Sequence, residues 1–457
     1  MINKKVNNAP DVVTTKHPLK FIDLFAGIGG FHHALTAPPI GAKCVMTVEI
    51  DPHCRQVYKS SLLNSKSRQK ELLLVSDIRS LTRNSNGITD RSLAKLAELI
   101  PDHDILCGGF PCQPFSKSGK QEGTSDETRG TLFFDIMRIV KAKKPKYIIL
   151  ENVPNLVGPR HFDTTWFTIV SQIRRAGYLV SDRPAILSPH ELPPDLGGTP
   201  QVRKRLFILA SRNDSHREQP DLNVRDYLDS IGTYSPDKWN ISEFLRPESV
   251  TTNHLLRDDE KMWLRAWQYF VQMIPHDNLP GFPIWERDLR ATIRKPNPCP
   301  PWKLEFLRKN QEFYILHKEL IDKWRTIDWS NGKSTSPVRV SDFPDSRRKF
   351  EWQARGYQPT QSQRDLFKLL IQFRPSGIRV KAPTYVPALV AINQTSILGN
   401  ELRRITPEEA AVLQGFPPSI FDNTDIDEKQ MYKQLGNAVP VGLVKFCAQW
   451  LIKQSQP

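Results

Sequence analysis

Short apolar runs alternate with amphipathic segments through the first half of the chain. Six apolar runs have the length of buried strands, at 21–25, 44–48, 72–75, 104–106, 147–150 and 206–210. Segments with helical spacing lie between them, such as 131–143, where Phe133, Ile136 and Val140 share one face. Strands that alternate with helices predict an α/β domain with a doubly wound, mostly parallel sheet.

The pattern changes after Ser211, where prolines and tryptophans become frequent. Helices are predicted there over 258–274, 302–327 and 362–373, and a final helix over 441–452. Apolar residues at helical spacing, including Trp263 and Trp267, predict a core rather than a surface. We therefore predict a polar tail at 1–18, a sheet domain at 19–211, a smaller second domain at 212–385, and a return to the sheet domain at 386–457.

Composition adds a partner class and a compartment. The 457 residues carry a formal net charge of +15, and a basic balance of this size suggests nucleic acid as a partner. Six scattered cysteines form no C-x-x-C pair, which is typical of reduced thiols in the cytoplasm rather than of a zinc site. The cysteine spacing leads us to expect no metal. No apolar run has the length of a bilayer span, so we expect no membrane.

A glycine-rich turn follows the first predicted strand and contains Phe25, Gly27 and Gly29. The next two strands end in acidic residues, Glu49 and Asp77. This pattern is typical of a site for a nucleotide-like cofactor, because glycines admit a ligand to the backbone and an acid can bind ribose. The alternative is a tight turn with two strand-end acids.

Cys112 follows Pro111 at the end of another predicted strand. A thiol at a strand tip of an open α/β sheet faces a cleft, which is where a nucleophile belongs. The alternative is a small buried residue, the usual role of an unpaired cysteine.

Six motifs, in order, resemble those of DNA (cytosine-5) methyltransferases. They are Phe25-x-Gly27-x-Gly29, Pro111-Cys112, Glu151-Asn152-Val153, Gln201-x-Arg203-x-Arg205, the segment 404–417, and Gly436-Asn437-Ala438-Val439-Pro440. The resemblance covers about 21–210 and 386–452. It places a target-recognition domain in the segment between them.

The resemblance implies a role for each motif residue. Cys112 would attack C6 of cytosine, a protonated Glu151 would donate to N3, and Arg203 and Arg205 would lie near O2 and the adjacent phosphates. The residues implied to bind S-adenosylmethionine, which would leave as S-adenosylhomocysteine, are Phe25, Gly27, Gly29, Glu49, Ile50, Asp77, Ile78, Leu132, Asn437 and Val439. Ile50 is a departure, because some members of the family have tryptophan there.

The resemblance also implies double-stranded DNA as the partner, with the target base flipped out and the loop 113–129 closing over it. It suggests a monomer that modifies DNA in a restriction-modification system, with a cognate restriction endonuclease. In the central segment, Arg347, Arg348 and Lys349 are the better candidates for phosphate contacts than the aromatic residues. Two other functions stay open: methylation of a tRNA, and DNA binding without catalysis.

Overall fold

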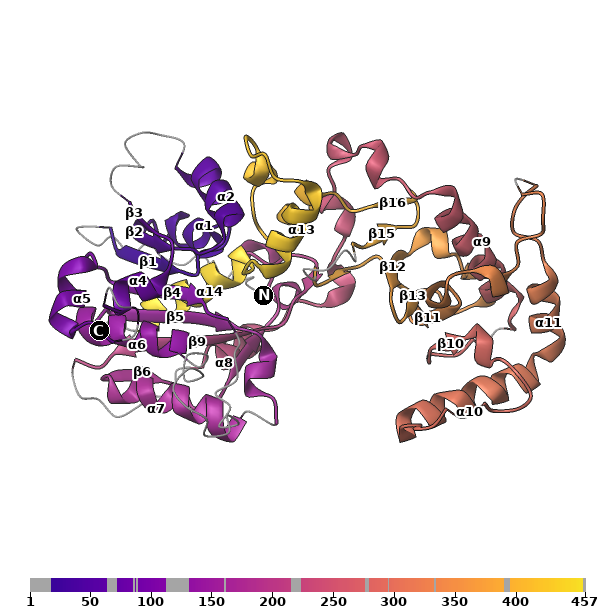
Figure 1. Ribbon diagram of the computed structural model, residues 1–457, viewed down its shortest axis with the longest axis horizontal. Helices are drawn as coiled ribbons and strands as arrows, with labels where there is room; N and C mark the ends of the chain where they lie inside the picture. Colours follow the sequence, from indigo (N-terminus) through magenta and orange to yellow (C-terminus); the bar gives the residue numbers. More distant parts are fainter. Residues whose placement is uncertain are drawn as a thin grey trace, which may run out of the picture. The chain divides into compact units, whose positions relative to one another are not determined.

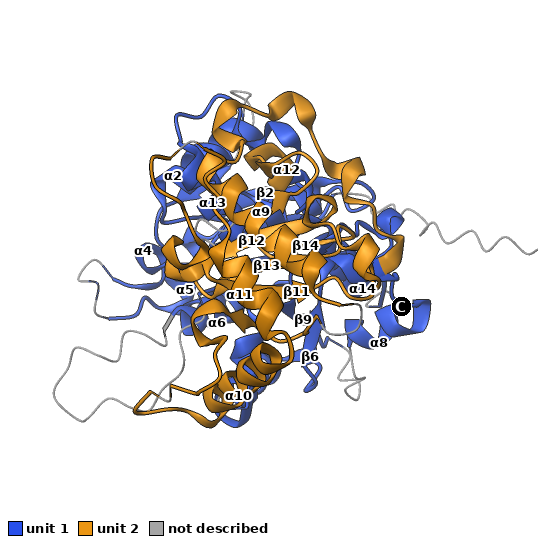
Figure 2. Ribbon diagram, turned by 90° about the vertical axis from the view of Figure 1, so that its right-hand side faces the viewer, with its two compact units in different colours: residues 1–236, 411–457 blue, residues 237–410 orange. Residues whose placement is uncertain are grey.

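The computed structural model describes residues 18–63, 72–84, 87, 89–111, 131–159, 162–214, 223–275, 279–294, 296–332, 334–389 and 395–454. Cys112 and the predicted closing loop 113–129 lie outside these residues. The chain divides into two compact units (Figure 2). Unit 1 contains residues 1–236 and 411–457, and unit 2 contains residues 237–410.

Unit 1 is built on one sheet of eight strands (Figure 1). Its main path runs β3 (Leu73–Val75), β2 (Lys43–Val48), β1 (Lys20–Leu24), β4 (Ile105–Gly109), β5 (Tyr147–Asn152), β9 (Arg205–Arg212) and β6 (Tyr178–Val180), and β7 (Ala185–Leu187) also pairs with β9. The first five are parallel, whereas β9 is antiparallel to its neighbours. The chain leaves β1 for β2 on one side and later returns to β4 on the other. The carboxyl ends of β1 and β4 therefore form a switch point, where α/β sheets bind ligands.

Helices cover both faces of this sheet. Ile22 and Leu24 point into a core formed with α4 (Ile78–Thr82), α5 (Leu93–Leu99), α6 (Thr131–Lys143) and α7 (Phe167–Arg175). The opposite face is covered by α1 (Gly30–Thr36) and α14 (Val441–Gln454), while α2 (Pro52–Leu62) follows β2. The predicted fold class is confirmed, and the strands were found because those buried on both faces are continuously apolar.

The run Glu428–Gln454 has the length and apolar composition of a membrane span, but 67% of its most apolar window is buried. It consists of α13 (Glu428–Asn437) and α14, and α14 packs on α1, β5 and β9. These contacts are those of a core helix of a globular unit.

Unit 2 has its own six-stranded sheet. The strand order is β10 (Ile284–Trp285), β11 (Lys349–Gln353), β13 (Gly377–Lys381), β12 (Leu370–Arg374), β15 (Ile397–Leu398) and β16 (Arg403–Arg404). Its longer helices are α9 (Asp258–Met273), α10 (Pro301–Leu316) and α11 (Lys318–Thr326). Trp263, Trp267, Trp324 and Trp352 are buried in one apolar cluster, as the spacing of the central segment predicts.

Two helices of the central segment differ from expectation. The helix predicted over 302–327 is divided at His317 into α10 and α11. The helix predicted over 362–373 is wrong: short 3-10 turns at Gln361–Gln363 and Leu366–Lys368 lead into β12. The apolar run of β12 is too short to distinguish a strand from a helix, and pairing with β13 and β15 decides it.

The unit boundaries lie further along the chain than the predicted 212 and 385. Residues 397–404 form β15 and β16, which extend the unit 2 sheet beside β12. Helix α8 (Val224–Ile231) instead packs on β7 and α14 of unit 1. Long-range strand pairing for 397–404 and helix packing for α8, which local sequence does not show, place these segments.

Candidate active site

The turn after β1 has the left-handed backbone that glycines favour. Gly27 and Gly29 have φ of 55° and 88°. Phe25, which follows β1 and precedes both glycines, has φ of 56°. A Cβ on Gly29 would lie 2.5 Å from Leu62 Cδ1, whereas one on Gly27 would meet no atom within 4 Å. The turn thus packs against Leu62 at Gly29 and is open at Gly27. The left-handed backbone of Phe25 costs about 1 kcal/mol or more.

The Glu49 carboxylate joins this turn to the one after β2. Its Oε2 accepts from Gly27 N at 2.7 Å, and its Oε1 accepts from Asp51 N at 2.7 Å. Burial raises the pKa of Glu49, and the two backbone N–H groups oppose that rise. Each oxygen retains acceptor capacity, so this carboxylate can position the glycine turn and still accept from a ligand hydroxyl.

Ile50 lies beside Glu49 with 62% of its surface exposed, an unusual exposure for an isoleucine next to a sheet edge. Arg55 Nη1 donates to the backbone oxygens of Glu49 and Ile50 at 2.9 and 2.7 Å. Arg55 therefore fixes the segment that carries both residues. The sequence motifs gave no signal for this arginine.

The Asp77 carboxylate lies at the start of α4, where its Oδ1 accepts from Arg79 N at 2.9 Å. The Arg79 guanidinium also binds it, with Nη2 2.7 Å from Oδ2, and this pairing lowers the pKa of Asp77. The side chain of Ile78 is buried in the core, and Leu132 packs against the same core. Any contact of Ile78 with a cofactor would therefore use its backbone.

The connection between α13 and α14 meets the ends of β1 and β4. Val439 lies so close to Gly30 that a Cβ there would be 2.5 Å from Val439 Cγ2, and one on Gly109 would be 3.5 Å from Val439 Cγ1. Asn437, two residues earlier, is exposed at the end of α13. Val439 therefore lies beside Gly30, the residue that directly follows the glycine turn.

Glu151 is a buried acid at the carboxyl end of β5, 7% exposed and paired in register with Gly109 of β4. Arg205 Nε lies 2.8 Å from Glu151 Oε1. Burial raises the pKa of Glu151, and the cations of Arg205 and Arg203 offset part of the rise. A raised pKa is the direction of shift that a proton donor near neutral pH requires.

The two arginines of the predicted pair have different surroundings. Arg205 begins β9 and contacts Glu151. Arg203 lies between β8 (Gln201–Val202) and β9, is completely buried, and donates from Nη2 to Gly436 O at 2.8 Å and Ala438 O at 2.6 Å. The expectation that both side chains share one face of a strand does not describe Arg203, because the strand begins after it.

Asn152 holds the segment that leads to Cys112. Its Nδ2 donates to Phe110 O at 2.9 Å, directly before Pro111. Sequence reasoning quoted Asn152 as part of a motif without giving it this role. The predicted nucleophile Cys112 is the next residue after Pro111 in the sequence and lies outside the described residues.

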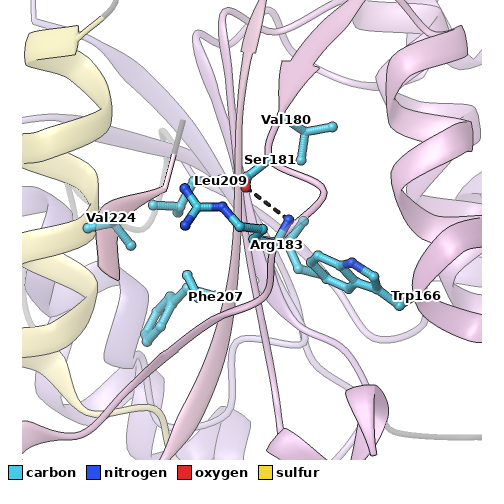
Figure 3. Close-up of a pocket in the computed structure, with 9 residues that line it drawn as sticks. Trp166, Val180, Ser181, Arg183, Phe207, Leu209 and Val224 are labelled. Carbon is cyan, nitrogen blue, oxygen red and sulfur yellow. Dashed lines mark hydrogen bonds between the residues drawn. The ribbon is translucent and has the colours of Figure 1, made fainter. Parts of the chain in front are cut away.

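A separate cavity under β9 has no part in this arrangement. It is lined by residues that include Trp166, Arg183, Phe207 and Val224, and Arg183 N donates to Ser181 Oγ at 3.1 Å (Figure 3). Its volume of about 10 Å³ admits no more than one water molecule. Within the described ranges, no group of three or more His, Cys, Asp or Glu residues could hold a metal ion.

The cationic segment of unit 2 is occupied by contacts within that unit. The Arg347 guanidinium lies 4.5 Å from the ring centroid of Phe373, Arg348 Nη2 lies 2.5 Å from Glu286 Oε2, and Lys349 Nζ lies 2.5 Å from an oxygen of Asp345. Phosphate binding by these three side chains stays a prediction.

Comparison with known proteins decides the family. Residues 19–453 match the family model for C-5 cytosine-specific DNA methylases. The chain belongs to this family. This DNA methylase is 37% identical to the Type II methyltransferase M.AluI of Cellulosimicrobium cellulans, over 93% of this chain and 90% of that protein. It is 38% identical to M.HhaI of Haemophilus parahaemolyticus over 46% of this chain and 52% of that protein.

The fold agrees with the family. The methylase superimposes on the crystal structure of S. pombe Dnmt2 with a TM-score of 0.51 at 18% identity, covering 95% of this chain and 99% of that one. The DNA methylase is thus an enzyme of DNA cytosine methylation with the predicted fold.

Proposed function

We propose that this enzyme transfers a methyl group from S-adenosylmethionine to C5 of a flipped cytosine in duplex DNA, through a covalent bond between Cys112 and C6. One observation supports it most: a buried acid with a raised pKa, Glu151, pairs in register with Gly109 on the strand that leads into Pro111-Cys112. An acid and a thiol at adjacent strand ends can act on one ring.

The chemistry requires both groups. The Cys112 thiolate forms a bond to C6, while Glu151 donates a proton to N3 and so takes up the charge that would develop on the ring. C5 then forms a bond to the methyl carbon, and the electron pair of the broken carbon–sulfur bond stays on the donor sulfur. Loss of the C5 proton to water and return of the N3 proton to Glu151 expel the thiolate and restore the aromatic ring.

The residues present fit the methyl donor. S-adenosylmethionine supplies an electrophilic methyl group when bound. The exposed apolar side chain of Ile50 would pack on adenine, the Glu49 carboxylate would accept from the ribose hydroxyls, and the open side of Gly27 would admit the methionine end to the backbone. Phe25, Gly29, Asn437 and Val439 would complete the walls, with Leu132 at their margin.

Both carboxylate oxygens of Asp77 already accept from the Arg79 guanidinium. Asp77 would therefore bind the adenine amino group only by sharing these oxygens with Arg79. Ile78 would contribute its backbone. We keep Asp77 in the proposed site as a residue that shares its oxygens, and Ile78 as one that contacts the cofactor through its backbone.

Unit 2 offers a cationic sheet face for DNA. Arg374, Arg379 and Lys381 lie opposite the side that Phe373, Ile378 and Val380 bury in the core. Glu351 pairs with Arg379 at 2.7 Å, so the group keeps an excess of positive charge. Lys381 Nζ lies 3.7 Å from the ring centroid of Tyr385, and burial together with Arg379 lowers the pKa of Lys381 to about 8. We assign phosphate contacts to these three cations.

The wider role follows from the relatives. M.AluI and M.HhaI are named Type II methyltransferases, and we propose that this enzyme likewise modifies DNA in a cytoplasmic restriction-modification system, with a cognate endonuclease. We propose that it acts as a monomer, with unit 2 as the target-recognition domain.

Methyl transfer with labelled S-adenosylmethionine tests the proposal. Duplex DNA, tRNA and single-stranded DNA are offered in parallel, and the methylated nucleoside is identified by mass spectrometry. We expect 5-methylcytosine in duplex DNA. Label in tRNA alone, label on a cytosine nitrogen, or DNA binding without transfer would each overturn it.

A further inference from the structure

Arg203 is a completely buried side chain that donates to backbone oxygens of a segment distant in the sequence. Nη2 donates to Gly436 O at 2.8 Å and to Ala438 O at 2.6 Å. The backbone N of Arg203 donates to Ser188 Oγ at 2.9 Å, which fixes the start of the side chain. The guanidinium thus bridges two carbonyls across the connection between α13 and α14.

These carbonyls are at the end of a helix. Gly436 belongs to the last turn of α13, and Ala438 is its C-cap residue. Carbonyls at a helix C-terminus lack intrahelical donors and carry the negative end of the helix dipole, so a buried cation there satisfies and stabilises them. The position of residues 436–439 therefore depends on Arg203.

A second anchor holds the same connection. Gln414 Nε2 donates to Leu435 O at 2.8 Å, and Val441 N donates to Gln414 O at 3.0 Å. Gln414 is buried, as is Arg203. The side chains of Arg203 and Gln414 thus bind backbone oxygens at 435, 436 and 438. The backbone oxygen of Gln414 accepts from Val441 N on the far side of Val439.

The held segment touches the site proposed for the methyl donor. Val439 contacts Gly30 at the start of α1 and lies near Gly109 at the end of β4. A shift of the connection would move Val439 away from the glycine turn before it disturbed Arg205, which contacts Glu151 from β9.

We propose that Arg203 is a positioning residue for the cofactor wall at 436–439, and that Arg205 alone of the pair acts at the nucleotide. This inference rests on the proposed function and divides its arginines between two tasks. Arg203 sets the affinity for the methyl donor, whereas Arg205 sets turnover on the bound base. A lysine at 203 would keep the charge but lose the planar fork that reaches both carbonyls.

The experiment compares R203K with the matched variant R205K. Calorimetric titration gives the dissociation constant for S-adenosylhomocysteine, and steady-state kinetics give kcat and the KM for each substrate. For R203K we expect at least a tenfold weaker cofactor constant, with the KM for DNA within twofold of the wild type. For R205K we expect the reverse: an unchanged cofactor constant and a kcat at least tenfold lower.

Q414A is the second arm, because it removes the side-chain contact with Leu435 O without touching either arginine, and thermal melts establish that each variant is folded. We expect Q414A to weaken cofactor binding in the same direction as R203K. Unchanged cofactor binding by R203K would overturn the inference while leaving the proposed function intact, and if R203K does not fold, unchanged binding by Q414A has the same meaning. Failure of the wild-type enzyme to bind the cofactor product would overturn both.

Discussion

Arg205 Nε lies 2.8 Å from Glu151 Oε1, so the buried acid proposed to donate a proton is already paired with a cation. Burial raises the pKa of Glu151, and Arg205 holds it lower than burial alone would. The pair gives the acid two competing influences. Its protonation is therefore adjustable by substitution of Arg205.

Replacing Glu151 with glutamine should affect turnover far more than cofactor binding. An amide cannot transfer a proton to N3, and loss of a general acid lowers kcat by roughly 10²–10⁴-fold. We expect the dissociation constant for S-adenosylhomocysteine to stay within about threefold of the wild type in E151Q. Unchanged turnover would remove Glu151 from the mechanism.

The pH profile of kcat should report the same acid. Turnover needs protonated Glu151, so kcat is present below its pKa and falls as pH rises through it. R205Q removes a cation that favours the ionised form, so the pKa rises and the alkaline decline moves to higher pH, even though the rate itself is lower. If kcat declined at the same alkaline pH in the wild type and in R205Q, Arg205 would not influence the pKa of Glu151.

Gly109 should tolerate no larger residue. A Cβ there would lie 3.0 Å from Glu151 Oε2 and 3.5 Å from Val439 Cγ1, so alanine would displace the acid. We expect kcat of G109A to fall by roughly ten- to a hundredfold, because small misplacements of catalytic groups are costly. G356A is the control, since a Cβ at Gly356 meets no atom within 4 Å and its kinetics should match the wild type.

Lys381 should contribute to DNA binding in a pH-dependent way. Phosphate binds its protonated form, and its pKa is lowered to about 8, so its contribution is present below that pH and is lost as pH rises above it. K381Q should reduce the slope of log affinity against log salt by about one. It should also weaken the dependence of DNA affinity on pH. K368Q, which removes a lysine that is 73% exposed, is the charge-matched control. An equal effect of both variants would argue against the sheet face.

The sequence predicted the unit 1 sheet well because its parallel strands are buried on both faces. β1, β2, β4 and β5 are mainly apolar runs that need little tertiary information, although β1 also buries Asp23. β12 has five residues, as β1 and β4 do, but its apolar run is interrupted by Gln372, and pairing with strands on both sides decided its structure.

The sequence correctly located Glu49 and Glu151 at the carboxyl ends of two strands, β2 and β5. Arg203 shows the limit, because its partner Gly436 is 233 residues away and no local pattern reveals that contact. Arg55 was missed although its partners Glu49 and Ile50 are six and five residues away, and Gln414 was part of a quoted motif without this role. They act through backbone atoms, which any residue provides.

The most direct test of the account is covalent trapping. Duplex DNA with 5-fluorocytosine at the target is incubated with the enzyme and S-adenosylmethionine, and adducts are separated under denaturing conditions. Fluorine at C5 cannot leave as a proton does, so the bond from Cys112 to C6 should persist in the wild type and be missing in C112A. An adduct of equal yield with C112A, or no adduct with a wild-type enzyme that methylates cytosine, would contradict the account.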